Sequence, residues 1–124
     1  MSSYMRSIVY FIRLLLLASI VTSALAQEVS IPDPGLNAAI REALQKPFGP
    51  LTQQDLLTLT NLSAGGQQIR SVQGLEAARN LRILDLDNNS LTNFNITSAL
   101  TNLTILDLFN NHLTNFVLSS GVEI

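Results

Sequence analysis

Cysteine and tryptophan are absent from this chain of 124 residues, and histidine occurs once, as His112. Many small secreted domains use disulfides to supplement a marginal core, so without cysteine this fold must be stabilised by packing. A transition-metal site would have no thiolate ligands, and one histidine with scattered carboxylates does not make one. The histidine also has no nucleophile or carboxylate grouped with it in the sequence. We therefore expect no enzyme activity, no metal site and no cofactor.

Positive charge is scarce as well. Seven basic residues stand against nine acidic ones, and two of the basic residues, Arg6 and Arg13, lie near the N-terminus. Residues 27–124 contain five basic and nine acidic residues, which gives them a net charge of −4. This balance provides no electrostatic footprint for nucleic acid or for an anionic membrane surface. We therefore do not expect a nucleic-acid partner.

A long apolar run near the N-terminus covers residues 14–21. Arg6 and Arg13 precede it and the small residues Ala24 and Ala26 follow it, which is the arrangement of a secretory signal peptide. The alternative is an uncleaved membrane anchor, but Arg13 interrupts the ~20 apolar residues that a span requires. We expect residues 1–26 to be cleaved off as a signal peptide, leaving no membrane span. The mature protein is then expected to be secreted or held at the cell surface, the periplasm included.

The rest of the sequence repeats itself. Residues 81–94 read "LRILDLDNNSLTNF", residues 103–116 read "LTILDLFNNHLTNF", and residues 59–72 are a weaker copy, "LTNLSAGGQQIRSV". Successive copies begin 22 residues apart and follow the pattern L-x-x-L-x-L-x-x-N-x-L-x-x-L. Within "LDL" the apolar residues alternate with a polar one, which predicts a short strand with one buried face. The asparagines that follow favour a turn, so each copy predicts a strand, a turn and a return segment.

This pattern resembles the leucine-rich repeat family. The resemblance implies an α/β solenoid, a right-handed coil in which each copy contributes one short parallel strand and neighbouring copies bury their leucines together. The repeats are expected at residues 59–80, 81–102 and 103–124. The next leucine of the pattern would fall one residue beyond the end, and nothing in the sequence resembles a C-terminal cap. We therefore expect the coil to be truncated at its C-terminus.

The segment before the repeats, residues 27–58, predicts helices. Asp33 followed by Pro34 is a helix start, and a T-x-x-D capping box at residues 52–55 predicts a second, short helix. Apolar residues follow the first start at helical spacing and predict a buried stripe: Leu36, Ala39, Ile40, Ala43 and Leu44. A helical segment without cysteine at this place resembles the N-terminal caps of secreted bacterial leucine-rich repeat proteins, the internalin-like group in particular. Such a cap shields the leucines and the strand edge of the first coil.

Two asparagines, Asn89 and Asn111, occupy the same position in the second and third copies. The resemblance implies an asparagine ladder, in which each buried amide forms hydrogen bonds with backbone groups of the adjacent turns. The alternative is an ordinary exposed turn asparagine, but the shared position in two copies favours the ladder. A buried amide needs such partners, because leaving it unpaired costs ~1–3 kcal/mol. Gln67 fills the position in the first copy and departs from the pattern.

The side chains that alternate with the buried leucines form a second set, which we call the strand face. The resemblance places it on the concave side of the coil. Its members are Asn61, Ser63, Ile83, Asp85, Asp87, Ile105, Asp107 and Phe109. Asp85 and Asp107 share a register, which allows a calcium site or a general acid/base pair, but no loop supplies the roughly six to eight oxygen ligands that calcium prefers. We favour the interpretation that these acids keep the sheet surface soluble.

The strand face combines isoleucines, acids and one exposed aromatic residue, Phe109, which we expect to be its strongest anchor. Extended sheet surfaces are how this repeat class usually contacts partners. The resemblance therefore implies a non-enzymatic protein–protein interaction module of a secreted or surface protein. Two alternatives remain: an accessory or adhesive repeat domain of a larger surface enzyme, and a non-functional remnant. The protein partner and the oligomeric state do not follow from the sequence.

Overall fold

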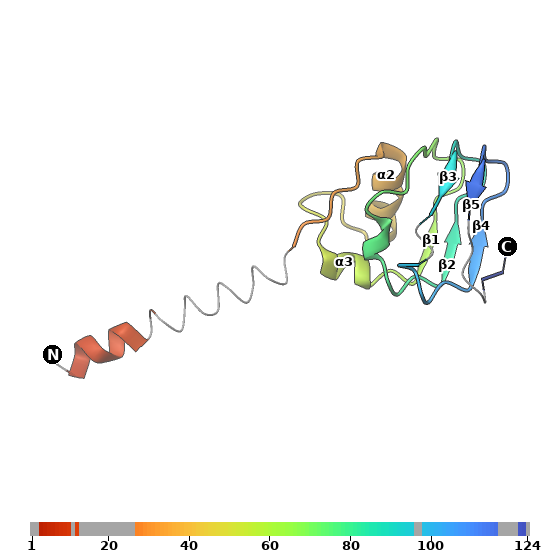
Figure 1. Ribbon diagram of the computed structural model, residues 1–124. Helices are drawn as coiled ribbons and strands as arrows, with labels where there is room; N and C mark the ends of the chain where they lie inside the picture. The colour runs from red at the N-terminus through yellow and green to blue at the C-terminus, as the bar shows by residue number, and fades with distance from the viewer. Residues whose placement is uncertain (1–2, 11, 13–26, 96–97, 117–121, 124) are drawn as a thin grey trace.

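The computed structural model describes residues 3–10, 12, 27–95, 98–116 and 122–123 (Figure 1). Residues 3–10 are helical. The apolar run at residues 14–21 and the expected cleavage site after Ala26 lie outside the described residues. Across the described residues, no helix has both the length and the apolar character needed to cross a membrane.

Helix α2 spans Pro34–Ala43. It begins there because the side chain of Asp33 accepts a hydrogen bond from the backbone N–H of Leu36 (3.0 Å), while Pro34 fills the first turn, where no N–H partner is needed. Three members of the predicted apolar stripe are buried against the repeats: Leu36, Ala39 and Ile40. The helix therefore closes one end of the core.

The end of α2 corrects the predicted stripe. Ala43 is exposed and Leu44 is only half-buried, although both continue the helical spacing. Leu44 still packs against the core from the C-cap of the helix, but Ala43 lies outside the buried surface. Arg41, in the last turn, holds the following loop instead, donating hydrogen bonds to the carbonyl oxygens of Lys46 (3.1 Å) and Gly49 (3.0 Å).

Helix α3 spans Gln53–Leu57 and confirms the predicted capping box. The Asp55 N–H donates to Thr52 Oγ1 (3.2 Å), and the Thr52 N–H donates to Asp55 Oδ2 (2.8 Å). Lys46 forms an ion pair with the same carboxylate (2.7 Å). Burial alone would raise the pKa of Asp55, but the hydrogen bonds and charge of Lys46, together with Thr52, bring it below its ordinary value.

The repeats form two small parallel sheets. The first sheet contains, side by side in chain order, β1 (Asn61–Ser63), β2 (Ile83–Asp85) and β4 (Ile105–Asp107). The second pairs β3 (Asn93–Phe94) with β5 (Asn115–Phe116). Every paired residue lies 22 positions from its partner, as Leu62, Leu84 and Leu106 do. The spacing of the repeat is therefore the register of the sheets (Figure 1).

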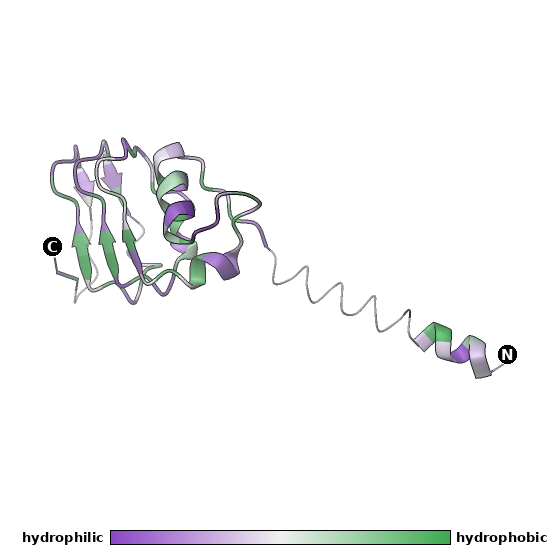
Figure 2. Ribbon diagram, turned by 180° about the vertical axis from the view of Figure 1, so that it is seen from behind, coloured by the Kyte–Doolittle hydropathy of each residue, from purple (hydrophilic) through white to green (hydrophobic). Residues whose placement is uncertain are grey.

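The core lies between the two sheets and is closed at the first repeat by α2, α3 and a 3₁₀ turn, η1 (Leu75–Ala77). The leucines of the second repeat, such as Leu84, Leu86 and Leu91, point inward and are fully buried, whereas Leu113 in the third repeat is only partly buried. Figure 2 shows a similar division along the chain, with hydrophobic strands in the first sheet and hydrophilic turns after them. A single repeat offers too few leucines for a core, so the repeats are stabilised by stacking.

The turn after each strand uses a left-handed backbone position. Gly66, Asn88 and Asn110 occupy it in successive repeats, with φ of 67°, 52° and 52°. Glycine and asparagine tolerate this region better than other residues. The double asparagine of the pattern therefore has two roles, because Asn88 and Asn110 shape the turn while the asparagine that follows each of them points inward.

The chain returns to the first sheet near its end. Glu123 forms a parallel bridge with Ile105, and its N–H donates to the Thr104 carbonyl (2.8 Å) while its own carbonyl accepts from the Leu106 N–H (2.9 Å). Strict repetition would place this contact four residues later, so the last return is shorter than the others. Pairing here satisfies backbone groups along the outer edge of β4.

Candidate binding surface

The strand face carries the largest exposed apolar side chains of the repeats. Ile83, Ile105 and Phe109 are 38%, 45% and 75% exposed, while Leu84 and Leu106, which alternate with them, are fully buried. Ile83 and Ile105 are register partners on β2 and β4. Side chains on neighbouring parallel strands lie about 5 Å apart, so Ile83 and Ile105 form an apolar pair. Phe109 lies further along the same face, beyond Asp107.

The acids of this face have a structural role that the sequence analysis did not identify. Asp85 Oδ1 accepts a hydrogen bond from the Asp87 N–H (3.0 Å), and Asp107 Oδ1 accepts from the Phe109 N–H (2.8 Å). Each carboxylate therefore ties its own strand to the residue two positions later, as Asp and Asn do in Asx turns. Ser63 takes the equivalent place in the first repeat and donates to Asp85 Oδ2 (3.2 Å). The sequence signal for these turns is an aspartate at the end of the strand, two positions before the residue whose N–H it accepts.

Asp87 is the acid most affected by its surroundings. Burial, and then the negative charges of Asp85 and Asp107, raise its pKa above the ordinary value. Asn88 donates a short hydrogen bond to its carboxylate, which offsets part of this effect. Gly65 makes room for it, since a Cβ there would lie 1.9 Å from Asp87 Oδ1. The strand face thus concentrates negative charge without compensation.

Metal binding has no structural support within the described part of the chain. No group of three or more histidine, cysteine, aspartate or glutamate side chains there is placed to hold a metal ion. His112 is exposed in its turn, and its backbone N–H donates to the Leu91 carbonyl (2.9 Å).

Asn89 joins two successive turns behind the strand face. Its Oδ1 accepts from the backbone N–H groups of Gln67 (3.1 Å) and Ile69 (2.9 Å), and its Nδ2 donates to the carbonyl oxygens of Ala64 (2.8 Å) and Leu86 (3.0 Å). The residue is buried. An amide in this position supplies partners to backbone groups that would otherwise be unpaired in the core.

Asn111 makes the equivalent bonds one repeat later. Its Oδ1 accepts from the Leu91 N–H (2.9 Å), and its Nδ2 donates to the carbonyl oxygens of Leu86 (2.8 Å) and Leu108 (3.1 Å). It is half-buried, unlike Asn89.

In the first repeat Gln67 occupies the position of the pattern's asparagine, and Asp33 of the cap makes the contacts to the repeat instead. The Gln67 side chain is exposed, and Asp33 Oδ2 accepts from the backbone N–H groups of Arg70 (2.8 Å) and Ser71 (3.1 Å) while its Oδ1 caps α2. Burial would raise the pKa of Asp33, but the hydrogen bonds from Arg70, Leu36 and Ser71 outweigh it and lower the pKa overall. One carboxylate therefore joins the helical cap to the repeats.

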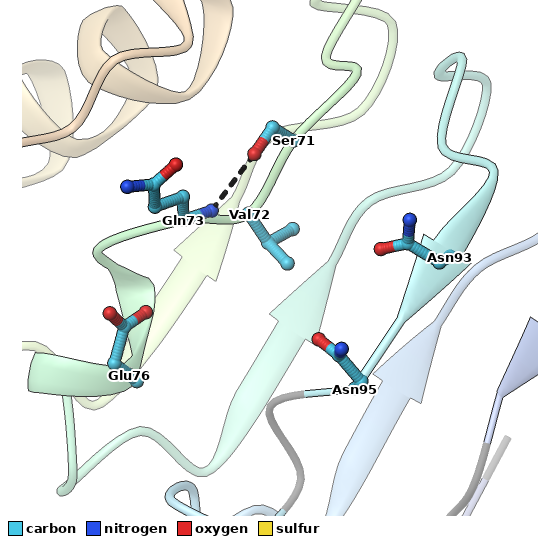
Figure 3. A pocket seen from close by; sticks show the side chains of 6 residues that line it. All are labelled: Ser71, Val72, Gln73, Glu76, Asn93 and Asn95. Carbon is cyan, nitrogen blue, oxygen red and sulfur yellow. Dashed lines mark hydrogen bonds between the residues drawn. The ribbon is translucent and has the colours of Figure 1, made fainter.

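A shallow pocket of about 260 Å³ lies on the other side of the repeats, between the first return segment and β3 (Figure 3). Its lining is mostly polar: Ser71, Val72, Gln73, Glu76, Asn93 and Asn95. The Glu76 carboxylate accepts from the Gly74 N–H (2.7 Å), and Ser71 Oγ accepts from the Gln73 N–H (3.2 Å). Both groups are used by the local fold, so the pocket is a weaker candidate than the strand face.

Comparison with known proteins finds similarity to internalins. No family model matches the chain. Internalin H of Listeria monocytogenes is 36% identical over 77 residues, which are 60% of this chain and 14% of that protein. The chain therefore spans only a small part of the length of this relative.

Solved structures agree with this comparison. An internalin (inlF) from Listeria monocytogenes aligns with 77% of this chain and 33% of its own length, at 29% identity and a TM-score of 0.65. Internalin C2 from the same species aligns with 68% of this chain and 38% of its own, at 34% identity and a TM-score of 0.64. A structure of the CBM51-2 and INT domains of ZmpB from Clostridium perfringens aligns with 66% of this chain and 17% of its own, at 34% identity and a TM-score of 0.60.

Proposed function

Because the chain is homologous to the internalins, bacterial leucine-rich repeat proteins, we propose that it is a non-enzymatic module that binds a protein partner through its strand face. Internalin-like repeat domains are generally protein-interaction modules. The observation that carries the proposal for this chain is the row of exposed Ile83, Ile105 and Phe109 on one sheet surface. Exposed apolar side chains gathered on one face mark interaction sites.

The proposed architecture is a right-handed coil with this face on its concave side. Parallel strands joined by crossover connections are right-handed in about 98% of cases. The strands here are parallel and adjacent in chain order, which is the arrangement that this rule covers. Residues 27–58 act as the helical cap, and the three repeats begin at Leu59, Leu81 and Leu103.

The proposed location is outside the cytoplasm, in the secreted or surface-attached fraction. The proposal is supported by the order of charges, apolar run and small residues at positions 1–26. Cleavage after Ala26 would leave the cap as the N-terminal element. N-terminal sequencing of the protein from the culture medium or the cell surface tests this cleavage. A protein that still contains residues 14–21 would contradict it.

A second candidate function is that of an accessory module in a larger surface protein. The observation that favours it is the similarity to the structure that contains the CBM51-2 and INT domains of ZmpB, of which this chain covers 17%. In that case the strand face would contact a neighbouring domain or a substrate of the larger protein. Both candidate functions use the strand face for binding, and they differ only in what binds to it.

Site-specific photo-crosslinking tests the proposed function. A photoreactive phenylalanine analogue replaces Ile105 on the strand face or, as the control, Thr92, which is exposed near β3 on the second sheet. The variants are irradiated with extracellular and surface proteins from the protein's native surroundings. We expect a discrete protein adduct from position 105 and none above background from position 92. Adducts from position 92 alone, or equally from both, would contradict binding through the strand face.

A further inference from the structure

Charge on the strand face is of one sign. Asp85, Asp87 and Asp107 lie on neighbouring strands or directly after them, and Asp85 and Asp107 are register partners. Within the described residues, none of the three carboxylates forms an ion pair, and the ion pair that does occur joins Lys46 to Asp55 elsewhere. No basic side chain among the described residues therefore relieves the repulsion among these acids through an ion pair.

Apolar groups border this charge on the same surface. Ile83 and Ile105 precede the acids along β2 and β4, and Phe109 follows Asp107 by two positions. The hydrogen bond from the Phe109 N–H to Asp107 Oδ1 fixes the spacing between ring-bearing residue and carboxylate. The ring is 75% exposed, although an aromatic side chain gains free energy from burial. A partner that covers this surface must therefore supply positive charge and tolerate apolar contact.

We propose that the strand face accepts a partner segment that presents arginine side chains, an inference that depends on the proposed function. Arginine meets each demand of the surface. Its guanidinium forms bidentate hydrogen bonds with carboxylates, and its plane stacks on aromatic rings. Its methylene stem packs on aliphatic side chains such as Ile83 and Ile105. An acidic segment would instead add repulsion to a surface that already carries three uncompensated acids.

The probes are three capped peptides of the same length, with the alternating sequence X-Thr-X-Thr-X in which X is arginine, glutamate or glutamine. Alternation presents the X side chains on one side of an extended segment. Each peptide is titrated into the ¹⁵N-labelled full chain at low and at moderate salt, and amide shifts are followed. Shifts locate the contact, and their concentration dependence gives the dissociation constant.

Two double variants with equal loss of charge separate a local effect from a general one. Asp87→Asn with Asp107→Asn removes two of the three negative charges of the face and keeps the Oδ1 acceptor that binds the Phe109 N–H. Glu28→Gln with Glu42→Gln removes the same charge from exposed positions elsewhere. We expect the arginine peptide to shift the amides around Ile83, Asp107 and Phe109. Its affinity should fall about tenfold in the face variant and less than twofold in the control.

Three results would overturn the inference. The first is an equal loss of affinity in both double variants, because it shows that only net charge matters. The second is a set of amide shifts away from the strand face. The third is binding of the glutamate or glutamine peptide to the face with the same affinity as the arginine peptide. This third result would overturn the choice of arginine and leave the proposed docking face standing, whereas photo-crosslinking from position 92 alone would overturn the docking face itself.

Discussion

Asp33 is the residue on which the junction between cap and repeats depends. It caps α2 through Leu36 and also accepts the N–H groups of Arg70 and Ser71, far along the chain. Hydrogen bonds to a charged acceptor are stronger than neutral ones, and their loss leaves backbone groups unpaired. The carboxylate is therefore part of the fold rather than of the binding surface.

Substitution of Asp33 tests this role at the residue scale. We expect Asp33→Ala to lower the free energy of unfolding by about 2 to 4 kcal/mol, because it removes a helix cap and two further acceptor contacts. Asp33→Asn should cost less, since its Oδ1 can still cap the helix. Urea unfolding followed by circular dichroism measures both, with Glu42→Ala, an exposed position in the same helix, as the control. Equal stability of Asp33→Ala and the control would refute the role.

Acid should weaken the protein for the same reason. The pKa values of Asp33 and Asp55 are lowered in the folded state from the ordinary 3.8, so unfolding takes up protons. Their contribution to stability is present above pH 3.8 and is lost as the pH falls through the lower folded-state values. We expect the melting temperature to drop on acidification below that value, and to drop less in Asp33→Asn. A drop of the same size in wild type and Asp33→Asn would contradict the account.

At the scale of elements, α2 lies very close to the first turn of the repeats. A Cβ on Gly35 would lie 2.2 Å from the Gln67 carbonyl oxygen, which is backbone and cannot move alone. We expect Gly35→Ala to destabilise the protein by about 1 to 3 kcal/mol through overpacking. The matched control is Ala38→Ser, an exposed position in the same helix. Unchanged stability of Gly35→Ala in thermal denaturation would show that the cap is not held this closely.

The strands of the first sheet were predictable from the sequence because burial and spacing coincide in them. The strands β3 and β5 were not, because each copy was expected to contribute one strand followed by a turn and a return segment. Leu84 and Leu106 occupy the same position in successive copies and both point inward. The register of 22 residues preserves this alternation of buried and exposed side chains. Helix starts were predictable as well, because the capping contacts of α2 and α3 are local. Ala43 was wrongly expected to be buried, since the extent of a packing surface depends on the neighbouring element and not on the helix itself.

Contacts between distant residues account for the rest of what the sequence did not predict. Asp33 and Ser71 are 38 positions apart, and no periodic pattern links them. The early return of Glu123 to Ile105 likewise departs from the repeat. The Asx turns of Asp85 and Asp107 are local and could have been predicted. The sequence analysis instead interpreted these acids only as charges that keep the sheet surface soluble. The candidate surface itself was predictable in composition, because its residues alternate with the leucines.

At the scale of the whole molecule, the repeats divide two tasks between alternating residues. Inward side chains join one turn to the next, and outward side chains remain exposed on the strand face, where we propose that a partner binds. The second and third copies are nearly identical on the inside, as Leu86 and Leu108 are, and on the strand face they differ only where Asp87 in one copy stands against Phe109 in the next. Stacking thus keeps the fold constant while this position of the strand face varies.

This division between buried and exposed side chains is tested most directly by the free energies of unfolding of three variants, two in β4 and one just after it. Leu106→Ala should cost about 2–5 kcal/mol as a buried truncation. Asp107→Asn and Phe109→Ala should each cost less than about 1 kcal/mol, because both side chains are exposed and asparagine keeps the Oδ1 acceptor of the Phe109 N–H. Urea unfolding of all three against wild type gives the comparison in one experiment. Equal destabilisation by the three variants would contradict the assignment of the strand face.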